Sequence, residues 1–401
     1  MSDKFTGKFT QQEPIPDEGI EAALNVLRHG RLHRYNVAEG EAGETALLEQ
    51  EFATYMGVKY ALAVASGGYA ISTALRAVGV VAGDKVLTNA FTLAPVPGAI
   101  ASLGAVPVFV GVTDALTIDL SDLEGKIAGS GAKVLLLSHM RGHICDMDAL
   151  MRICDAAGVQ VIEDCAHTMG ARWRGVLSGR HGVMAAYSTQ TYKHMNSGEG
   201  GLLVSDDATL MARAVMFSGS YMLYERHLAG PPADAFENLR YEVPNISGRM
   251  DNLRAAILRP QLRALDRQVA AWNERYRVVE DGLRGTPGLT VIERPKEEEY
   301  VGSSIQFLLL DWADDQIDAV LQRCAARGVE LKWFGGAEPS GFTSRYDSWR
   351  YAPTQSLPDS DRVLKGILDM RLPLTFSLSD CEQIAGIIRA EVGAVYQQWA
   401  G

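Results

Sequence analysis

A regular alternation between continuous apolar segments and helical segments, from residue 44 to residue 164, restricts the fold of this chain more than any other feature. Helices are predicted at 44–56, 70–77, 95–103 and 146–157. The apolar segments, which predict buried strands, are 60–66, 85–90, 106–112, 132–138 and 159–164. Buried strands separated by helices are typical of a mostly parallel sheet with helices on both faces. We therefore predict an α/β fold.

Three of these predicted strands end in polar residues. The first ends at Ser66, the fourth at Ser138 followed by His139, and the fifth at Asp164. Ligands of parallel sheets bind where strands end and loops begin. A binding site is therefore expected at this edge of the sheet.

The remainder of the chain predicts a second, smaller unit. A long helix is predicted at about 250–283, a charged surface loop at 293–300, and a mixture of short strands and helices beyond them. A chain of 401 residues exceeds what one hydrophobic core usually serves. We predict a large domain with an N-terminal arm over residues 1–265 and a small C-terminal α+β domain over residues 266–401.

The composition argues against several classes of partner. The chain has 47% hydrophobic and 22% charged residues, as soluble globular proteins do, and its net charge of -11 disfavours nucleic acid and anionic membranes. It has no apolar run of membrane-spanning length and no signal-peptide core at the N-terminus, so a cytoplasmic protein is expected. The five cysteines are odd in number and lack CxxC spacing, which predicts a reduced protein without a structural zinc site. No metal site is predicted.

The junction after the first strand is suited to a phosphate. Ser66-Gly67-Gly68-Tyr69 lies between a predicted strand and a predicted helix. Free backbone N–H groups and the positive end of a helix attract anions. By itself, a glycine pair that only turns the chain explains this stretch equally well.

The stretch "VIEDCAHTMGARW" places a carboxylate at the end of a buried strand. An unpaired Asp164 would be costly there, so it is expected to face a cation or a donor. His167 follows about one turn later. By themselves, these residues are more simply explained by a turn cap and a core histidine.

The stretch "YSTQTYKHMNSGEGG" places Lys193 between two apolar segments, 183–187 and 202–204. Ser188 precedes the lysine and four residues of sequence Gly-Glu-Gly-Gly follow it at 198–201. A lysine held among apolar strands has a lowered pKa and attacks carbonyls as a free amine. A solvated turn residue is the simpler explanation for a single lysine.

Together the three stretches indicate pyridoxal 5'-phosphate (PLP). The phosphate would bind the helix N-terminus at Gly67 and Gly68, and Asp164 would keep the pyridine nitrogen protonated. Lys193 would form the Schiff base and then act as acid and base. A dinucleotide, the second candidate, requires GxGxxG after the first strand, and "SGGYAI" does not supply it.

At these residues the chain resembles the DegT/DnrJ/EryC1/StrS family of PLP-dependent sugar aminotransferases. The resemblance covers nearly the whole length through "FATYMGVKYALAVASGG", "NAFTLAPVPGAIASLGAVPVFVGV", "HMRGHICDMDAL", "VIEDCAHTMGARWRG", "GEGGLLVSDD" and "GRMDNLRAAILRPQLRALD". "EDCAH" and "GARW" are similar to the 3-amino-5-hydroxybenzoate synthase branch, and "HGRLHRYN" to a branch that aminates an eight-carbon keto sugar acid.

The resemblance implies the aspartate-aminotransferase fold (fold type I), with a seven-stranded-type sheet between helices in a large PLP-binding domain. It also implies a homodimer in which each active site borrows residues from the other subunit. The implied roles are the Schiff-base lysine for Lys193, the pyridine-nitrogen partner for Asp164, a place beside the ring for His167, and phosphate contacts for Ser188, Gly67 and Gly68.

The sequence departs from the family pattern in three places. Gly68 replaces a threonine that usually helps to hold the phosphate, and Tyr69 is expected to compensate. Leu93 replaces the aromatic residue that usually stacks on the ring. Asn245, the nearest candidate for the residue shared between subunits, stands four residues before Arg249 instead of two.

The leading functional hypothesis is transfer of an amino group from an L-amino acid, glutamate or glutamine, to a keto sugar, sugar acid or cyclitol. One alternative is a PLP-dependent sugar dehydratase, in which a histidine replaces the lysine; His194 is adjacent to Lys193. Another is a non-catalytic regulator with this fold. Candidates for lining the acceptor site are Arg34, Tyr35, Arg141 and Trp333, although a structural role is the simpler explanation for each.

Overall fold

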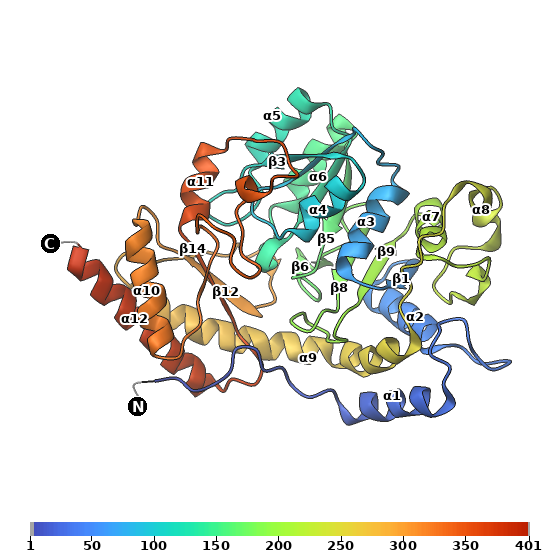
Figure 1. Cartoon of the computed structure of the whole chain (residues 1–401), viewed down its shortest axis with the longest axis horizontal. Coiled ribbons are helices and arrows are strands. Elements are labelled where there is room, and N and C mark those ends of the chain that lie inside the picture. The colour runs from blue at the N-terminus through green and yellow to red at the C-terminus, as the bar shows by residue number, and fades with distance from the viewer. Residues whose placement is uncertain (1–3, 400–401) are drawn as a thin grey trace.

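The computed structural model describes residues 4–399, and its centre is a seven-stranded sheet (Figure 1). The strand order is β1-β9-β8-β5-β4-β2-β3. Only β9 runs antiparallel to its neighbours in this sheet, so the predicted mostly parallel α/β architecture is confirmed. The strands are β1 (Tyr60–Val64), β2 (Lys85–Asn89), β3 (Val106–Val110), β4 (Val134–Ser138), β5 (Gln160–Asp164), β8 (Met184–Ser188) and β9 (Gly201–Ser205).

Helices cover both faces of this sheet, which explains why its strands are apolar at successive positions. On one face α3, α4 and α7 share a core with Ile162 of β5. On the other face α2, α5, α6 and α9 pack on the sheet, and Val161 of β5 lies in that layer. Adjacent residues of a strand point to opposite faces, so burial of both requires two helical layers. The helices are α2 (Glu44–Met56), α3 (Gly67–Ala77), α4 (Pro95–Ser102), α5 (Leu120–Ser130), α6 (Met147–Ala157), α7 (Ala208–Ser218) and α9 (Asn252–Leu283).

The start of α3 matters for the site and differs from the predicted segment 70–77. The hydroxyl of Ser66 accepts a hydrogen bond from the backbone N–H of Tyr69 at 3.1 Å. This cap begins the helix at Gly67, directly after the end of the first strand. The amide groups of the first turn therefore lie at the edge of the sheet.

A second, four-stranded antiparallel sheet forms the core of the C-terminal region, with the order β10-β12-β14-β13. Phe5 and Phe9 lie in the same core, where both rings contact Phe376 edge to face. The helix α9 crosses the expected boundary between residues 265 and 266 without a break, and the division there stays a prediction. The elements are β10 (Thr290–Val291), β12 (Ser304–Leu308), β13 (Lys332–Trp333), β14 (Ile367–Arg371), α10 (Asp314–Ala326), α11 (Pro358–Lys365) and α12 (Leu378–Trp399).

The predicted surface loop at 293–300 is only partly correct. Within it, Glu298 is 8% exposed and accepts a hydrogen bond from Arg294 at 2.8 Å. This ion pair compensates the two charges and allows the segment to pack on the protein. The segment contributes a strand to a small sheet made of β6 (Arg172–Trp173), β7 (Val176–Leu177) and β11 (Glu298–Glu299).

The remaining elements are short, apart from α1, which runs along α9 in Figure 1. They are α1 (Asp17–His29), α8 (Leu239–Glu242) and the 3-10 turns Met140–Gly142, Tyr224–Arg226, Ala233–Phe236 and Tyr346–Ser348. Across residues 4–399, every helix is too short or too polar to cross a membrane.

Candidate active site

A pocket lies where β4, β5 and β8 end beside the N-terminus of α3. Most of the residues that the sequence singled out are brought together there. The pocket is lined by Gly67, Gly68, Ile71, Leu93, Pro95, Val96, Ser138, Met140, Asp164, Ala166, His167, Ser188 and Lys193.

One end of this pocket is suited to an anion. A Cβ atom at Gly67 would lie 2.7 Å from Cβ of Ser188, so only glycine permits this approach of α3 to the end of β8. The first amide groups of α3 have no acceptor within the helix and lie at its positive end. The hydroxyl of Ser188 stands beside them. This arrangement is compatible with the predicted phosphate contacts, which stay a prediction.

Asp164 forms the polar floor of the pocket. Its carboxylate is 6% exposed and accepts hydrogen bonds from the Ser138 hydroxyl at 3.1 Å and the Ala166 N–H at 3.2 Å. Burial raises the pKa of Asp164 above its ordinary value, although these bonds and the charge of Lys193 act against the shift. A carboxylate accepts about four hydrogen bonds, so capacity remains for a donor in the pocket.

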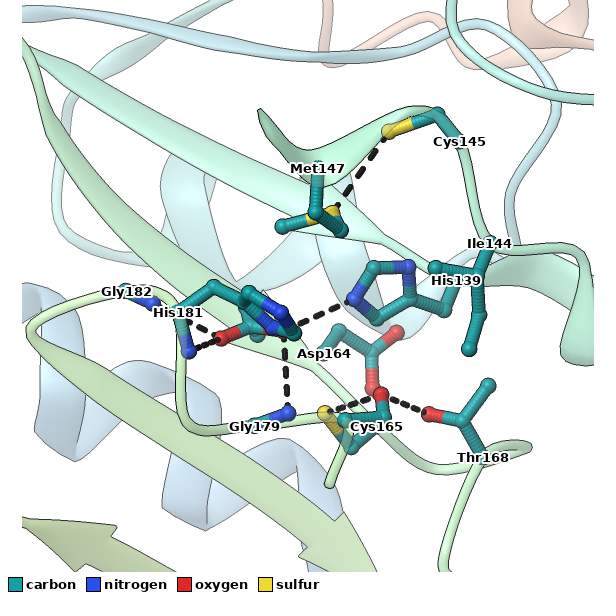
Figure 2. Close-up of polar contacts among 12 residues, drawn as sticks. His139, Ile144, Cys145, Met147, Asp164, Cys165, Thr168, Gly179, His181 and Gly182 are labelled. Atoms are coloured by element: carbon teal, nitrogen blue, oxygen red, sulfur yellow. Dashed lines mark hydrogen bonds and ion pairs between the residues drawn. The ribbon is translucent and has the colours of Figure 1, made fainter. Parts of the chain in front are cut away.

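The preceding residue, Glu163, belongs to a separate network on the other face of β5. Its carboxylate accepts hydrogen bonds from the amides of Gly179, His181 and Gly182 at 2.8–2.9 Å and contacts the His139 ring nitrogen at 3.0 Å (Figure 2). Burial opposes ionisation, but the bonds from His139 and His181 hold the pKa of Glu163 well below its ordinary range.

This network also contains a possible group of metal ligands. His139, Glu163 and Cys165 place one ligand atom each within 4.8 Å of one another. The Glu163 carboxylate is already saturated with donors, and the Cys165 sulfur contacts the Ser178 hydroxyl at 3.4 Å. Burial also raises the pKa of Cys165 well above its ordinary value, which disfavours the thiolate that a metal requires. The group is therefore best explained as structural.

Lys193 reaches the pocket from the turn after β8. Its Nζ atom lies 2.7 Å from Nε2 of His167. Burial, followed by the charge of Arg141, lowers the pKa of Lys193 to about 7, whereas Asp164 acts in the opposite direction. Burial and the charge of Lys193 also hold the pKa of His167 well below its ordinary value. Near neutral pH, about half of the Lys193 side chains are therefore free amines beside a neutral imidazole.

The adjacent His194 does not take the place of the lysine. Its Nε2 lies 3.0 Å from the hydroxyl of Ser303, and its ring packs edge to face on Trp272. His194 is not among the residues that line the pocket with Asp164. The arrangement therefore disfavours the dehydratase alternative, which requires a histidine at the position of Lys193.

Three further predicted residues have different surroundings. Leu93 lines the pocket. Tyr69 does not, because its hydroxyl donates to the backbone carbonyl of Phe217 at 3.0 Å. Asn245 is exposed, lies outside the pocket of its own chain and accepts a hydrogen bond from the Ser247 N–H. The cofactor contacts expected of all three stay predictions.

The four candidates for lining the acceptor site have different surroundings. Arg34 is held by two hydrogen bonds of 2.8 Å to buried Glu49, and the Tyr35 hydroxyl lies 2.7 Å from the His227 ring. The indole N–H of Trp333 donates to a backbone carbonyl at 2.6 Å. These three have the structural partners that were the simpler explanation, whereas Arg141 lines a second pocket next to Lys193.

Sequence reasoning missed Arg371, which also lines that second pocket. Arg371 ends β14 and is far from Lys193 in the sequence. Nothing in the surrounding residues, "DMRLPL", distinguishes it from an ordinary strand residue.

Comparison with known proteins identifies the family of this chain. The model of the DegT/DnrJ/EryC1/StrS aminotransferase family matches residues 17–389. A protein of Streptoalloteichus tenebrarius, assigned as an L-glutamine:3-amino-2,3-dideoxy-scyllo-inosose aminotransferase, is 30% identical over 86% of this chain and 83% of its own length. The 3-amino-5-hydroxybenzoate synthase of Amycolatopsis mediterranei is 36% identical, over 61% of each chain.

Solved structures agree with the fold. The crystal structure of a 3-amino-5-hydroxybenzoic acid synthase superimposes with a TM-score of 0.82 and 26% identity, over 96% of this chain and 99% of the other. The predicted fold type I architecture is thereby confirmed. The chain belongs to the DegT/DnrJ/EryC1/StrS aminotransferase family.

Proposed function

We propose that this aminotransferase uses PLP to move the amino group of an L-amino acid, glutamate or glutamine, to a ketone of a sugar, sugar acid or cyclitol. One observation carries the proposal: Lys193 and Asp164 line a single pocket that ends at the N-terminus of α3. The S. tenebrarius relative, whose name states L-glutamine and a scyllo-inosose, supports the substrate class.

The residues of the pocket fit the cofactor at each of its polar ends. The phosphate would be held by the amides of Gly67 and Gly68 and by the hydroxyl of Ser188. These two glycines have no side chain that would fill the space at the start of α3. Asp164, which retains capacity for another donor, would hold the proton of the pyridine nitrogen. Leu93 would cover a face of the ring by apolar contact.

Lys193 and His167 would perform the proton transfers. With a pKa of about 7, Lys193 would supply the amine that holds the cofactor and would carry a proton to and from the substrate carbon. The neutral ring of His167, 2.7 Å from Nζ, would orient this amine. The bound cofactor would supply the electron sink that makes the substrate carbon acidic.

We also infer a homodimer with shared active sites. The exposed position of Asn245, outside the pocket of its own chain, is compatible with a contact to the cofactor of a partner subunit. Light scattering of the purified protein measures the oligomeric state. A monomer with full activity would contradict the inference.

The cofactor is tested by absorbance and labelling. We expect an absorbance band at about 420 nm, typical of lysine-bound PLP. After reduction with borohydride, mass spectrometry should find PLP attached to Lys193. Lys193→Ala should abolish both signals, whereas the exposed Lys332→Ala should retain them. Protein that carries no band, and gains none with added PLP, would instead support a non-catalytic regulator.

The substrates are tested by half-reactions. The pyridoxamine form of the enzyme is prepared with L-glutamine or L-glutamate, and its loss is followed against neutral keto sugars, keto sugar acids and keto cyclitols. A productive acceptor restores the band at about 420 nm. If none of the three classes restores it, the proposed acceptor class is wrong.

A further inference from the structure

A second pocket adjoins the candidate active site, and its charged side chains are cationic. Its lining residues include Arg141, His167, Lys193, Ser303, Ser304 and Arg371. No aspartate or glutamate is among the described residues that line it. Lys193 and His167 line both pockets, so a ligand in the second one lies next to the reacting amine.

Arg141 is buried at this site without complete hydrogen bonding. Its side chain is 6% exposed and forms an ion pair with Asp369 at 2.8 Å. This contact joins Nη2 of Arg141 to Oδ2 of Asp369 but is not aligned as a hydrogen bond, and among the described residues neither these two atoms nor Nε of Arg141 has a hydrogen-bond partner. The Nε atom of Arg34 is also without a partner, but both of its Nη atoms make aligned hydrogen bonds to Glu49. Buried polar atoms are usually satisfied, so the misaligned contact to Asp369 leaves donors of Arg141 available to a further acceptor.

Arg371 presents a second guanidinium to the same pocket. It stands two positions after Asp369 on β14 and therefore on the same face of the strand. Its guanidinium lies 3.8 Å from the ring centre of Tyr192 and 5.1 Å from that of Phe342, on which Arg141 also stacks at 4.9 Å. No carboxylate of residues 4–399 forms an ion pair with Arg371. The aromatic rings hold both arginines in place; the charge of Arg141 is paired with Asp369, whereas that of Arg371 is available to a ligand.

We propose that Arg141 and Arg371 bind a carboxylate group of the substrate that reacts at Lys193. The planar guanidinium groups match a carboxylate and form charge-assisted hydrogen bonds with it. This inference rests on the proposed aminotransfer. Two sources share this chemistry: the α-carboxylate of the amino donor, and an acid group of the acceptor.

Binding of a plain carboxylate is the first test. Succinate and its neutral diamide are titrated into the PLP-loaded enzyme by calorimetry. We expect succinate to bind more tightly than the diamide. The Arg371→Met substitution should weaken the binding of succinate by about tenfold or more, because it removes a charge-assisted contact. Arg371→Lys should retain part of the affinity. Arg389→Met, on the exposed face of α12, is the matched control and should bind as the parent does.

Kinetics then identify the source of the carboxylate. If the donor supplies it, Arg371→Met raises the KM for L-glutamine but not for its α-amide. If the acceptor supplies it, the variant reacts more slowly than the parent with a keto sugar acid but at the same rate with a neutral keto sugar. Equal succinate affinity in parent and variant, with both half-reactions unchanged, would overturn the proposal. A normal band near about 420 nm in the same variant separates that failure from a failure of the proposed cofactor chemistry.

Discussion

Glu163 and Asp164 are neighbours on one strand, yet their surroundings are opposite. Glu163 is completely buried and is surrounded by three backbone amides and a histidine. Asp164 faces the pocket with one hydroxyl and one amide as donors. The pKa of Glu163 is lowered by its partners, whereas burial raises that of Asp164. A saturated carboxylate stabilises the fold, and an unsaturated one beside a pocket is available to a ligand.

The largest effect is expected for the activity of Asp164→Asn. An amide cannot keep the pyridine nitrogen protonated, so the transamination rate should fall by about 1,000-fold, within the usual range for a proton-holding group. Single-turnover kinetics with L-glutamine measure it, and a melting temperature no lower than that of the parent confirms that the fold is intact. A rate within a few-fold of the parent would remove Asp164 from the mechanism.

The second effect concerns stability at the neighbouring residue. Glu163→Gln would place an amide nitrogen against backbone N–H donors, and the free energy of unfolding should decrease by about 3 kcal/mol. Urea denaturation of the apoprotein measures this change. Equal stability of variant and parent would show that the Glu163 network is not structural.

The third effect concerns the free energy of unfolding as a function of pH, and its sign is opposite for the two residues. The folded pKa of Glu163 lies below its ordinary 4.5, so its contribution to stability is present above that pH and is lost as the pH falls through the folded value. The folded pKa of Asp164 lies above its ordinary 3.8, so its ionised form opposes folding, and acid relieves this penalty.

The apoprotein of Asp164→Asn should accordingly be more stable than the parent at pH 7, and this gain should shrink toward pH 4. Glu163→Gln should show a deficit at pH 7 that shrinks below pH 4.5. Urea denaturation at several pH values compares the two. Deficits in both variants at pH 7 would contradict the distinction between the residues.

The smallest effect is expected for Ser138→Ala, which removes the only side-chain donor to Asp164 among the described contacts. A hydrogen bond from a hydroxyl to a carboxylate contributes about 1.5 kcal/mol, so the rate should fall by about tenfold. Thr92→Ala, which removes the donor to Ser138 itself, is the matched control and should change the rate less. The reverse order would mean that Ser138 does not act through Asp164.

The alternation of apolar segments and the polar ends of three strands were sufficient to predict the sheet and that Asp164 and the junction at 66–69 lie at one edge of it. Parallel strands bring their ends to one edge, so local patterns in the sequence predict residues that meet there. Lys193 was predicted only from its combination with Asp164 and the junction at 66–69, because a single lysine on a turn is more simply explained as a solvated residue. The charged segment at 293–300 was mispredicted because its burial depends on the Arg294–Glu298 pair, which no periodicity reveals.

The sequence by itself therefore determined the α/β fold and the residues at the strand ends, because these depend on local periodicity and on short spacings, and the resemblance of its motifs indicated the family. The tertiary structure alone decided that Glu163 is saturated while Asp164 is available, and that the hydroxyl of Tyr69 points to Phe217. It also placed Arg371, from the C-terminal sheet, beside Arg141 and Lys193. Contacts of this kind depend on how distant elements pack.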